Sequence, residues 1–365
     1  MTTLPTMDVG SRIARLRSTF EVAEIDALLV TRLPNVAYLT GFTGSAGVVL
    51  VTPGDAVLVT DGRYAQQSTE QLAHAGVTAR VEIASTPAAQ QAALTTSPIG
   101  TRLGLEAHGV TWAQQRTYSE WFTAETLVPT EHLVEGLRAV KEAGEVARIK
   151  AACDIADESL AAVLPRLKEG ITERAFALAL EWEMRGRGAT KTSFDTIVAS
   201  GPNGAKPHAR PTDRVIGEGE LVVIDFGCVV DGYCSDMTRT VSVGDPGADA
   251  RKVWDVVAAS QRAGRDAVRA GIECKSVDLA SRAVIDDAGW GEAFAHGTGH
   301  GVGLEIHEAP RVSATADATL EAGHVVTVEP GVYLPGIGGV RIEDTVVVTS
   351  DGAEALTEFP KSLVI

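Results

Sequence analysis

Three histidines that lie close together in the sequence are the residues best suited to chemistry. His296, His300 and His307 fall within the segment HGTGHGVGLEIH and make up three of the chain's eight histidines. The glycines between them let the backbone pass close to a bound group. Any one of these histidines alone is better explained as a hydrogen-bonded core residue. The interpretation therefore depends on the polar residues that accompany this segment.

Four acids are embedded in apolar, strand-like segments on both sides of the histidines: Asp225 ends LVVID, Asp236 opens DMTRTV, Glu329 ends VVTVE and Glu343 lies in GVRIEDTV. A lone acid at a strand end is usually solvated. Four acids directed into one cavity would repel each other and become protonated unless cations neutralise them. Two divalent cations cancel four negative charges, and a neutral imidazole completes the ligand set. The sequence thus predicts a dinuclear site, with Mn²⁺ as the best match and Co²⁺ or Zn²⁺ as alternatives. Its predicted ligands are Asp225, Asp236, His300, Glu329 and Glu343.

The elements that position these acids show a weak internal duplication. A glycine, an apolar strand, an acid and a second glycine occur over residues 219–227 and again over 323–331, an offset of 104 residues. Asp225 and Glu329 occupy the same place in the two copies. Chance similarity between two β-rich segments is the alternative, but the shared acid favours a pseudo-two-fold arrangement in which both strands meet at one site.

The first part of the chain predicts a separate α/β domain. An amphipathic helix is expected over roughly residues 9–24, followed by strands and helices that alternate as far as about residue 130. The glycine-rich segment 41–47 lacks the spacing of a phosphate-binding loop and is predicted to be a plain turn. A charged helical stretch begins near Leu137, so the predicted domains are 1–136 and 137–365.

Composition excludes several classes of protein. The chain has 365 residues and a net charge of −16, which argues against a nucleic-acid partner and against binding to an anionic membrane. The longest apolar runs have the length of strands, so no membrane span is expected. Four cysteines without C-x-x-C spacing, and an N-terminus without the features of a secretion signal, predict a cytoplasmic protein.

The motifs around these acids and histidines resemble those of the pita-bread metallopeptidases, the family of methionyl aminopeptidase, prolidase and Xaa-Pro aminopeptidase. The resemblance covers roughly residues 137–355, and every metal-ligand position is filled. It implies that His208 and His307 are catalytic histidines. It also implies that His296 lines the substrate pocket, and that Arg341 corresponds to an arginine of the proline-specific branch.

The resemblance also implies a fold. The expected architecture is of the α/β (α+β) class: a creatinase-like N-terminal α/β domain followed by a pita-bread catalytic domain with pseudo-two-fold internal symmetry. Creatinase itself shares the fold but lacks the metal ligands. Because all five ligand positions are filled in this sequence, creatinase activity is disfavoured. Because the family forms dimers and tetramers, a homodimer or homotetramer is expected.

Several functions are compatible with these residues. The preferred one is an Xaa-Pro aminopeptidase, which removes the first residue of a peptide with proline in second position. This preference rests on the segments GFTGSAG and TDGRY of the N-terminal domain. A prolidase, which cleaves only Xaa-Pro dipeptides, is the alternative, and Arg210 would then be a candidate to bind the terminal carboxylate. Methionyl aminopeptidase is disfavoured because it resembles neither the RIEDT segment nor the N-terminal domain, and a non-catalytic binding relative is disfavoured because no ligand is missing.

The expected mechanism is attack of metal-activated water on the carbonyl carbon that precedes proline. His307 would stabilise the oxyanion, and Glu329, both ligand and proton shuttle, would carry a proton to the proline nitrogen. His208, His296 and Arg341 are predicted to form the polar wall of the proline pocket. Two simpler roles stay open, a structural one for His208 and neutralisation of nearby negative charge for Arg341.

Overall fold

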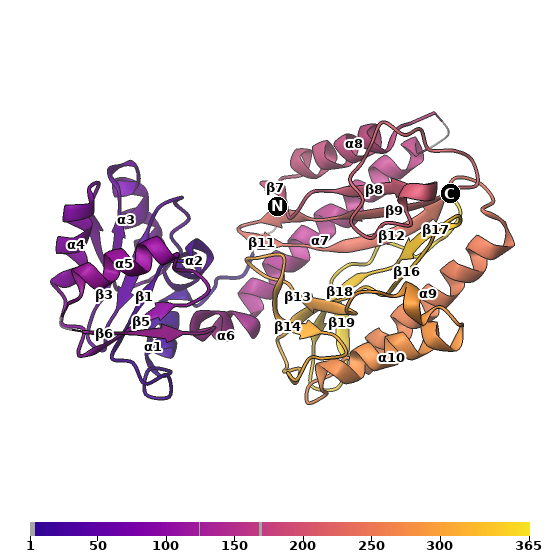
Figure 1. Ribbon diagram of the computed structural model, residues 1–365. Helices are drawn as coiled ribbons and strands as arrows, with labels where there is room; N and C mark the ends of the chain where they lie inside the picture. Colours follow the sequence, from indigo (N-terminus) through magenta and orange to yellow (C-terminus); the bar gives the residue numbers. More distant parts are fainter. Residues whose placement is uncertain (1–3, 124, 168–169) are drawn as a thin grey trace. The chain divides into compact units, whose positions relative to one another are not determined.

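The chain folds as two units in the computed structural model, which describes residues 4–123, 125–167 and 170–365 (Figure 1). One unit comprises Thr6–Arg138, and the other comprises Ala139–Ile365 together with the segment before Thr6. Among the described residues, no helix is both long and apolar enough to cross a bilayer.

The first unit is built on a six-stranded mixed sheet with the order β4-β3-β2-β1-β5-β6. Its strands are β1 (Ala27–Val30), β2 (Val48–Val51), β3 (Ala56–Thr60), β4 (Arg80–Ile83), β5 (Arg102–Glu106) and β6 (Thr126–Thr130). Its helices are α1 (Arg12–Arg17), α2 (Leu33–Thr40), α3 (Ala65–His74), α4 (Pro87–Thr95), α5 (Trp112–Trp121) and α6 (Leu133–Ala139). The central strands β1 and β3 are fully buried, as expected for strands covered on both faces.

Two helix predictions were wrong in their bounds. The helix expected over 9–24 is a 3-10 turn, Val9–Ser11, followed by α1, which ends at Arg17. There, the hydroxyls of Ser18 and Thr19 bond to carbonyls three residues earlier and compete with helix propagation. The helical stretch expected from Leu137 is interrupted between α6 and α7 (Ala143–Val163), where Glu142 forms a capping box with Glu145.

The first half of the second unit pairs two helices with an antiparallel sheet. Helices α7 and α8 (Glu173–Gly186) pack together, and the sheet has the order β12-β9-β8. Its strands are β8 (Ile197–Ser200), β9 (Leu221–Phe226) and β12 (Met237–Ser242), and the short strands β7 (Lys191–Thr192), β10 (Cys228–Val230) and β11 (Tyr233–Cys234) form a separate sheet.

The second half repeats this arrangement, with α9 (Gly247–Ala267) packed on α10 (Cys274–Asp287) and a sheet of order β14-β13-β15-β18-β19. Its strands are β13 (Gly299–Gly301), β14 (Glu308–Val312), β15 (Val325–Val328), β18 (Asp344–Val348) and β19 (Ala353–Ala355); the hairpin β16 (Gly331–Leu334) and β17 (Gly338–Arg341) pairs separately. The antiparallel pair β9–β12 in the first half corresponds to β15–β18 in the second. The predicted pseudo-two-fold is therefore confirmed.

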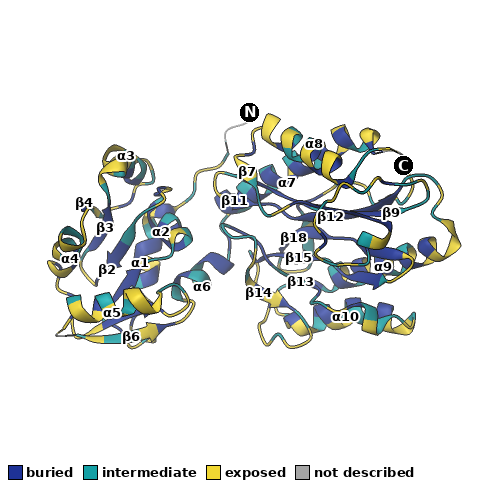
Figure 2. Cartoon of the chain, turned by 45° about the horizontal axis from the view of Figure 1, so that its top comes forward, coloured by how far each residue is buried: buried dark blue, intermediate teal, exposed yellow. Residues whose placement is uncertain are grey.

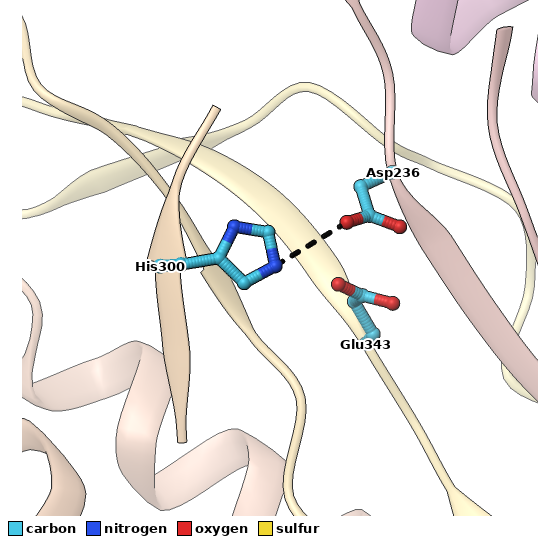
Figure 3. Close-up of side chains that lie close together, drawn as sticks. All are labelled: Asp236, His300 and Glu343. Carbon is cyan, nitrogen blue, oxygen red and sulfur yellow. Dashed lines mark ion pairs between the residues drawn. The ribbon is translucent and has the colours of Figure 1, made fainter. Parts of the chain in front are cut away.

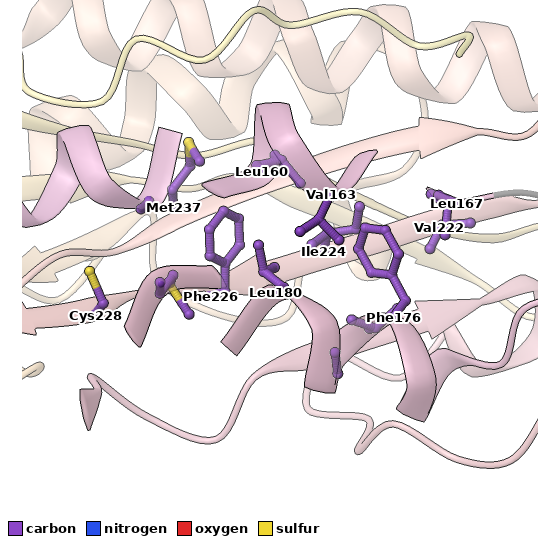
Figure 4. Close-up of a cluster of buried hydrophobic side chains, with 14 of the residues drawn as sticks. Leu160, Val163, Leu167, Phe176, Leu180, Val222, Ile224, Phe226, Cys228 and Met237 are labelled. Carbon is purple, nitrogen blue, oxygen red and sulfur yellow. The ribbon is translucent and has the colours of Figure 1, made fainter. Parts of the chain in front are cut away.

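Apolar clusters fix the helices of each half on its strands. In the first half, Phe176 and Leu180 of α8 pack against Ile224 and Phe226 of β9, and all four are fully buried (Figure 4). Each such side chain contributes roughly 1.5–3 kcal/mol on burial. In the second half, Gly264 of α9 allows close approach to α10, because a Cβ there would lie 2.1 Å from the Ser281 hydroxyl. Helices packed against the sheets thus hold the strands that carry the acids in place (Figure 2).

Candidate metal centre

The four predicted acids lie at or beside strand ends in the second unit, and the predicted histidine lies within a short strand. Asp225 is the penultimate residue of β9, and Glu329 directly follows the equivalent strand β15. Asp236 directly precedes β12, and Glu343 directly precedes the equivalent strand β18. His300 is the central residue of β13, which pairs with β15. The duplicated strands therefore supply the acids in equivalent pairs.

Side chains of three of these residues converge on one point (Figure 3). Asp236, His300 and Glu343 each direct one donor atom into a group whose members lie within 4.8 Å of one another. The Nε2 atom of His300 lies 3.5 Å from Asp236 Oδ2 and 3.3 Å from Glu329 Oε1. Three of the predicted acids are thus gathered around the imidazole of a fourth predicted ligand, His300.

The fifth predicted ligand, Asp225, is paired with Arg341. Its Oδ2 atom accepts a hydrogen bond from Nη2 of this arginine, which is 3% exposed. Arg341 also donates to the Tyr333 hydroxyl at 2.7 Å, to the Thr238 hydroxyl at 3.1 Å and to the Pro207 carbonyl at 3.2 Å. The guanidinium of Arg341 thus pairs with Asp225, which fits the neutralising role considered from the sequence; a role in the substrate pocket stays a prediction.

Two buried carboxylate oxygens suit a bound cation. Asp225 Oδ1 and Glu343 Oε1 are both buried and have no hydrogen-bond partner among the described residues. Buried polar atoms normally have a hydrogen-bond partner, so a bound ligand is expected at these two oxygens. Four carboxylates with one imidazole form the hard, oxygen-rich donor set that divalent cations prefer. The residues present therefore fit the predicted metals.

The acids perturb each other's ionisation in the way expected of such a set. Burial, and then the charge of Glu343, raise the pKa of Asp236 well above its ordinary value. Burial, and then the charge of Glu329, do the same to the pKa of Glu343. Burial, the largest single influence, acts to raise the pKa of Glu329, but the hydrogen bond with His300 and the charges of His300, His296 and Arg341 together outweigh it and lower that pKa to about 2. Burial likewise raises the pKa of Asp225, although Arg341 opposes it. Cations in place of protons would relieve the same repulsion.

The backbone around His300 sets the direction of its ring. Nδ1 lies 3.0 Å from the Gly301 carbonyl, so a proton on Nδ1 would donate to that carbonyl and Nε2 could bind a metal in place of its contact with Glu329. The main-chain N–H of His300 donates to the Thr327 hydroxyl, which in turn donates to Glu329 Oε1 at 3.1 Å. Gly299 is required here, since a Cβ would lie 2.0 Å from the Thr327 carbonyl oxygen.

The other three histidines surround this cluster at different depths. The His307 ring stacks edge-on against His300, with 4.4 Å between centroids, and burial lowers its pKa. His296 is held by the Tyr333 hydroxyl, 3.0 Å from Nε2, and burial lowers its pKa too. His208 is exposed, beside the Pro207 carbonyl that binds Arg341, and its charge acts on both His296 and His307.

Sequence reasoning missed two residues of the site. Tyr333 links His296 to Arg341 through one hydroxyl, and its place four residues after Glu329 was the available signal. Arg311 on β14 is exposed and close enough to His307 for its charge to contribute, after burial and the charge of His300, to the lowered pKa of that histidine. Arg210 is 85% exposed and lies 3.4 Å from Asp195, so its charge is already paired.

Comparisons with known proteins agree with this architecture. The chain matches metallopeptidase family M24 over residues 147–350 and the creatinase/prolidase N-terminal domain over residues 12–140. The structure is similar to that of the Xaa-Pro dipeptidase from Bacillus anthracis, with a TM-score of 0.92 and 40% identity over 98% of this chain and 100% of that one. It is also similar to the X-Pro aminopeptidase from Thermotoga maritima, with a TM-score of 0.86 and 34% identity over 95% of this chain and 100% of that one. In sequence it is 33% identical to the Xaa-Pro dipeptidase of Pyrococcus horikoshii over 98% of this chain and 100% of that protein.

The chain therefore belongs to the M24 metallopeptidase family and carries a creatinase/prolidase N-terminal domain. The predicted family and fold class are confirmed.

Metal removal is expected to destabilise the fold. Without cations, Asp236 and Glu343 face each other as buried acids, whereas a bound metal stabilises only the folded state. At a free metal concentration of about 100 Kd this linkage contributes about 2.7 kcal/mol. Thermal unfolding with and without a chelator measures the effect, with restoration of Mn²⁺ as the control. An unchanged Tm in protein verified to have lost its metal would contradict this prediction.

Proposed function

We propose that this protein is a metal-dependent Xaa-Pro dipeptidase, a prolidase, that hydrolyses the bond between the two residues of a dipeptide ending in proline. The sequence alone favoured the aminopeptidase, with prolidase as the alternative. The similar proteins fit the alternative better, because full-length relatives spanning both units are named Xaa-Pro dipeptidases. That full-length similarity, joined to the convergent acids and histidine, is the observation that carries the proposal.

In this proposal Asp225, Asp236, His300, Glu329 and Glu343 hold two divalent cations. When bound, such cations polarise the scissile carbonyl and lower the pKa of a water molecule. The oxygen-rich donor set favours Mn²⁺. The four cysteines are free and buried, which supports a cytoplasmic location for the proposed enzyme. A homodimer or homotetramer remains part of the proposal through the family resemblance.

The chain's own residues divide the remaining chemistry between them. Hydrolysis adds the hydroxyl of water to the carbonyl carbon and its proton to the proline nitrogen. Glu329 lies beside His300 and carries the carboxylate that accepts the water proton and passes it to the departing nitrogen. His307, kept neutral by its lowered pKa, donates a hydrogen bond to the oxyanion. His296 and His208 line the pocket that takes the proline ring.

A dipeptidase must also bind the carboxylate that directly follows the proline ring. Arg311 is the better candidate for this role, because its charge reaches His307 and it forms no ion pair among the described residues. Arg210, the candidate from the sequence, is engaged with Asp195 at the surface. A guanidinium pairs with a carboxylate through two parallel hydrogen bonds, which gives specificity for a free C-terminus.

The expected result is that Arg311→Ala raises KM for an Xaa-Pro dipeptide by roughly 10- to 100-fold, the size of one lost charged hydrogen bond, with kcat little changed. Arg210→Ala is the matched control and should leave KM near the wild-type value. The assay compares kcat/KM for Xaa-Pro and Xaa-Pro-Xaa-Xaa substrates side by side. Hydrolysis of the longer peptide at an equal or higher kcat/KM would overturn the dipeptidase proposal in favour of the aminopeptidase.

A further inference from the structure

A buried ion pair lies directly behind one of the candidate metal ligands. Successive residues of a strand point to opposite faces, so Glu343 turns toward the acid cluster while Asp344 turns away from it. Asp344 is 0% exposed and pairs with Arg239 of β12, which is 2% exposed, at 3.0 Å. Neither partner of this pair belongs to the proposed ligand set.

The guanidinium of Arg239 donates most of its hydrogen bonds to main-chain carbonyls. Nη1 donates to the carbonyl of Thr238 at 3.0 Å and to the carbonyl of Glu343 itself. Nε and Nη2 both donate to the Phe359 carbonyl, at 3.0 and 2.6 Å. One side chain thus ties together the strand β12, the ligand residue Glu343 and the C-terminal segment.

A side chain of the C-terminal segment also bonds to Asp344. Lys361 donates to Asp344 Oδ2 at 2.6 Å, and Gln261 of α9 donates to the same oxygen at 3.0 Å. The Thr357 hydroxyl accepts the main-chain N–H of Thr345 at 3.1 Å. The Thr345 hydroxyl in turn donates to the carbonyl of Asp236, a second candidate ligand, at 2.8 Å. The network therefore holds the backbone of two candidate ligands.

Thr238 holds Glu343 through two further hydrogen bonds. Its main-chain N–H donates to the Thr238 carbonyl at 3.1 Å, and its Oε2 atom accepts from the Thr238 hydroxyl at 2.7 Å. Oε1 has no partner among the described residues and is available to bind a metal. Since the carbonyl of Glu343 is bound by Arg239, this residue cannot shift along its strand without breaking the buried network.

We infer that the Arg239–Asp344 pair is a positioning device that holds Glu343 in place for metal binding and fastens the C-terminal segment 357–361 behind it. This inference rests on the proposed metal site. A buried ion pair is often no more stabilising than apolar residues of similar volume, so stability alone does not account for one here. Partners outside the ligand set that orient a metal ligand typically change metal affinity by about 10- to 100-fold when they are removed.

The test separates positioning from simple structural support. The double variant Arg239→Met/Asp344→Leu replaces the pair with apolar side chains of similar size, and Asp344→Asn keeps the shape but removes the charge. Each full-length protein is stripped of metal, and its Kd for Mn²⁺ is measured by calorimetry. Chemical denaturation of the metal-free forms reports stability. Arg12→Met is the matched control, since Arg12 is a 1% exposed arginine of the other unit that donates to the Tyr38 carbonyl.

The double variant is expected to weaken Mn²⁺ binding by about 10- to 100-fold, and Asp344→Asn to weaken it to a smaller extent. Arg12→Met should lower stability but leave the Kd for Mn²⁺ unchanged. Wild-type affinity in a folded double variant, or in Asp344→Asn should the double variant fail to fold, would overturn the inference and leave the metal site standing. If the wild-type protein itself binds no Mn²⁺, the metal site fails, and the inference fails with it.

Discussion

Glu343→Ala is expected to abolish Xaa-Pro hydrolysis and to remove bound metal. Glu343 is 1% exposed, contributes to the convergent group with Asp236 and His300, and has a buried oxygen without a hydrogen-bond partner in the described part of the chain. Loss of one transition-state donor costs about 10²–10³-fold in kcat. Loss of a ligand should exceed this, because the metal that activates water is lost with it.

Elemental analysis and kcat measurement on the same preparation test this prediction. Glu354→Ala on β19 is the matched control, since Glu354 is an exposed glutamate of the same sheet. Asp236→Ala should behave like Glu343→Ala because Asp236 occupies the equivalent position in the first half. A Glu343→Ala enzyme with full metal content and wild-type activity would remove Glu343 from the site.

His307→Ala is expected to lower kcat by about 10²-fold or more while metal content stays intact. The His307 ring packs edge-on against His300 but is not part of the convergent donor group. Its lowered pKa keeps it neutral and able to donate one hydrogen bond to a developing oxyanion. The substitution should therefore lower kcat, which reports the chemical step, more than it raises KM.

Separate kcat and KM values, together with metal analysis, decide the role of His307. His74→Ala, at an exposed histidine at the end of α3, serves as the control. If His307→Ala is purified without its metal, His307 is itself a ligand and the five-residue set is incomplete.

Strand periodicity carried most of the site prediction. Alternation along a strand places Glu329 on the same face as Thr327, and the structure shows these side chains hydrogen-bonded. The repeat of an acid after an apolar strand indicated that two distant segments are equivalent, and β9 and β15 are. Such patterns are local and depend only on the two-residue period of a strand, so the sequence could show them.

The pairing of polar atoms between elements was decided only by the tertiary structure. The sequence left two roles open for Arg341, in the substrate pocket or as a neutralising charge, and gave no partner for it; the approach of β9 to the hairpin β16–β17 pairs it with Asp225 and Tyr333. Helix bounds at Arg17 and Ala143 likewise depended on hydroxyl and capping contacts that compete with the helical pattern.

The Arg239–Asp344 pair shows why these contacts are hidden in the sequence. The sequence next to Arg239 (TRT) and next to Asp344 (EDT) does not indicate that the guanidinium of Arg239 will reach the carbonyls of both Glu343 and Phe359. Those carbonyls lie more than a hundred residues from Arg239 along the chain and come within reach only when the C-terminal segment packs behind β18. The sequence alone indicated which residues lie on the face of the candidate metal centre, because the two-residue period of a strand decides which side chains share a face. Only the fold determined what holds them there, because a buried donor bonds to whichever acceptor packing brings near it.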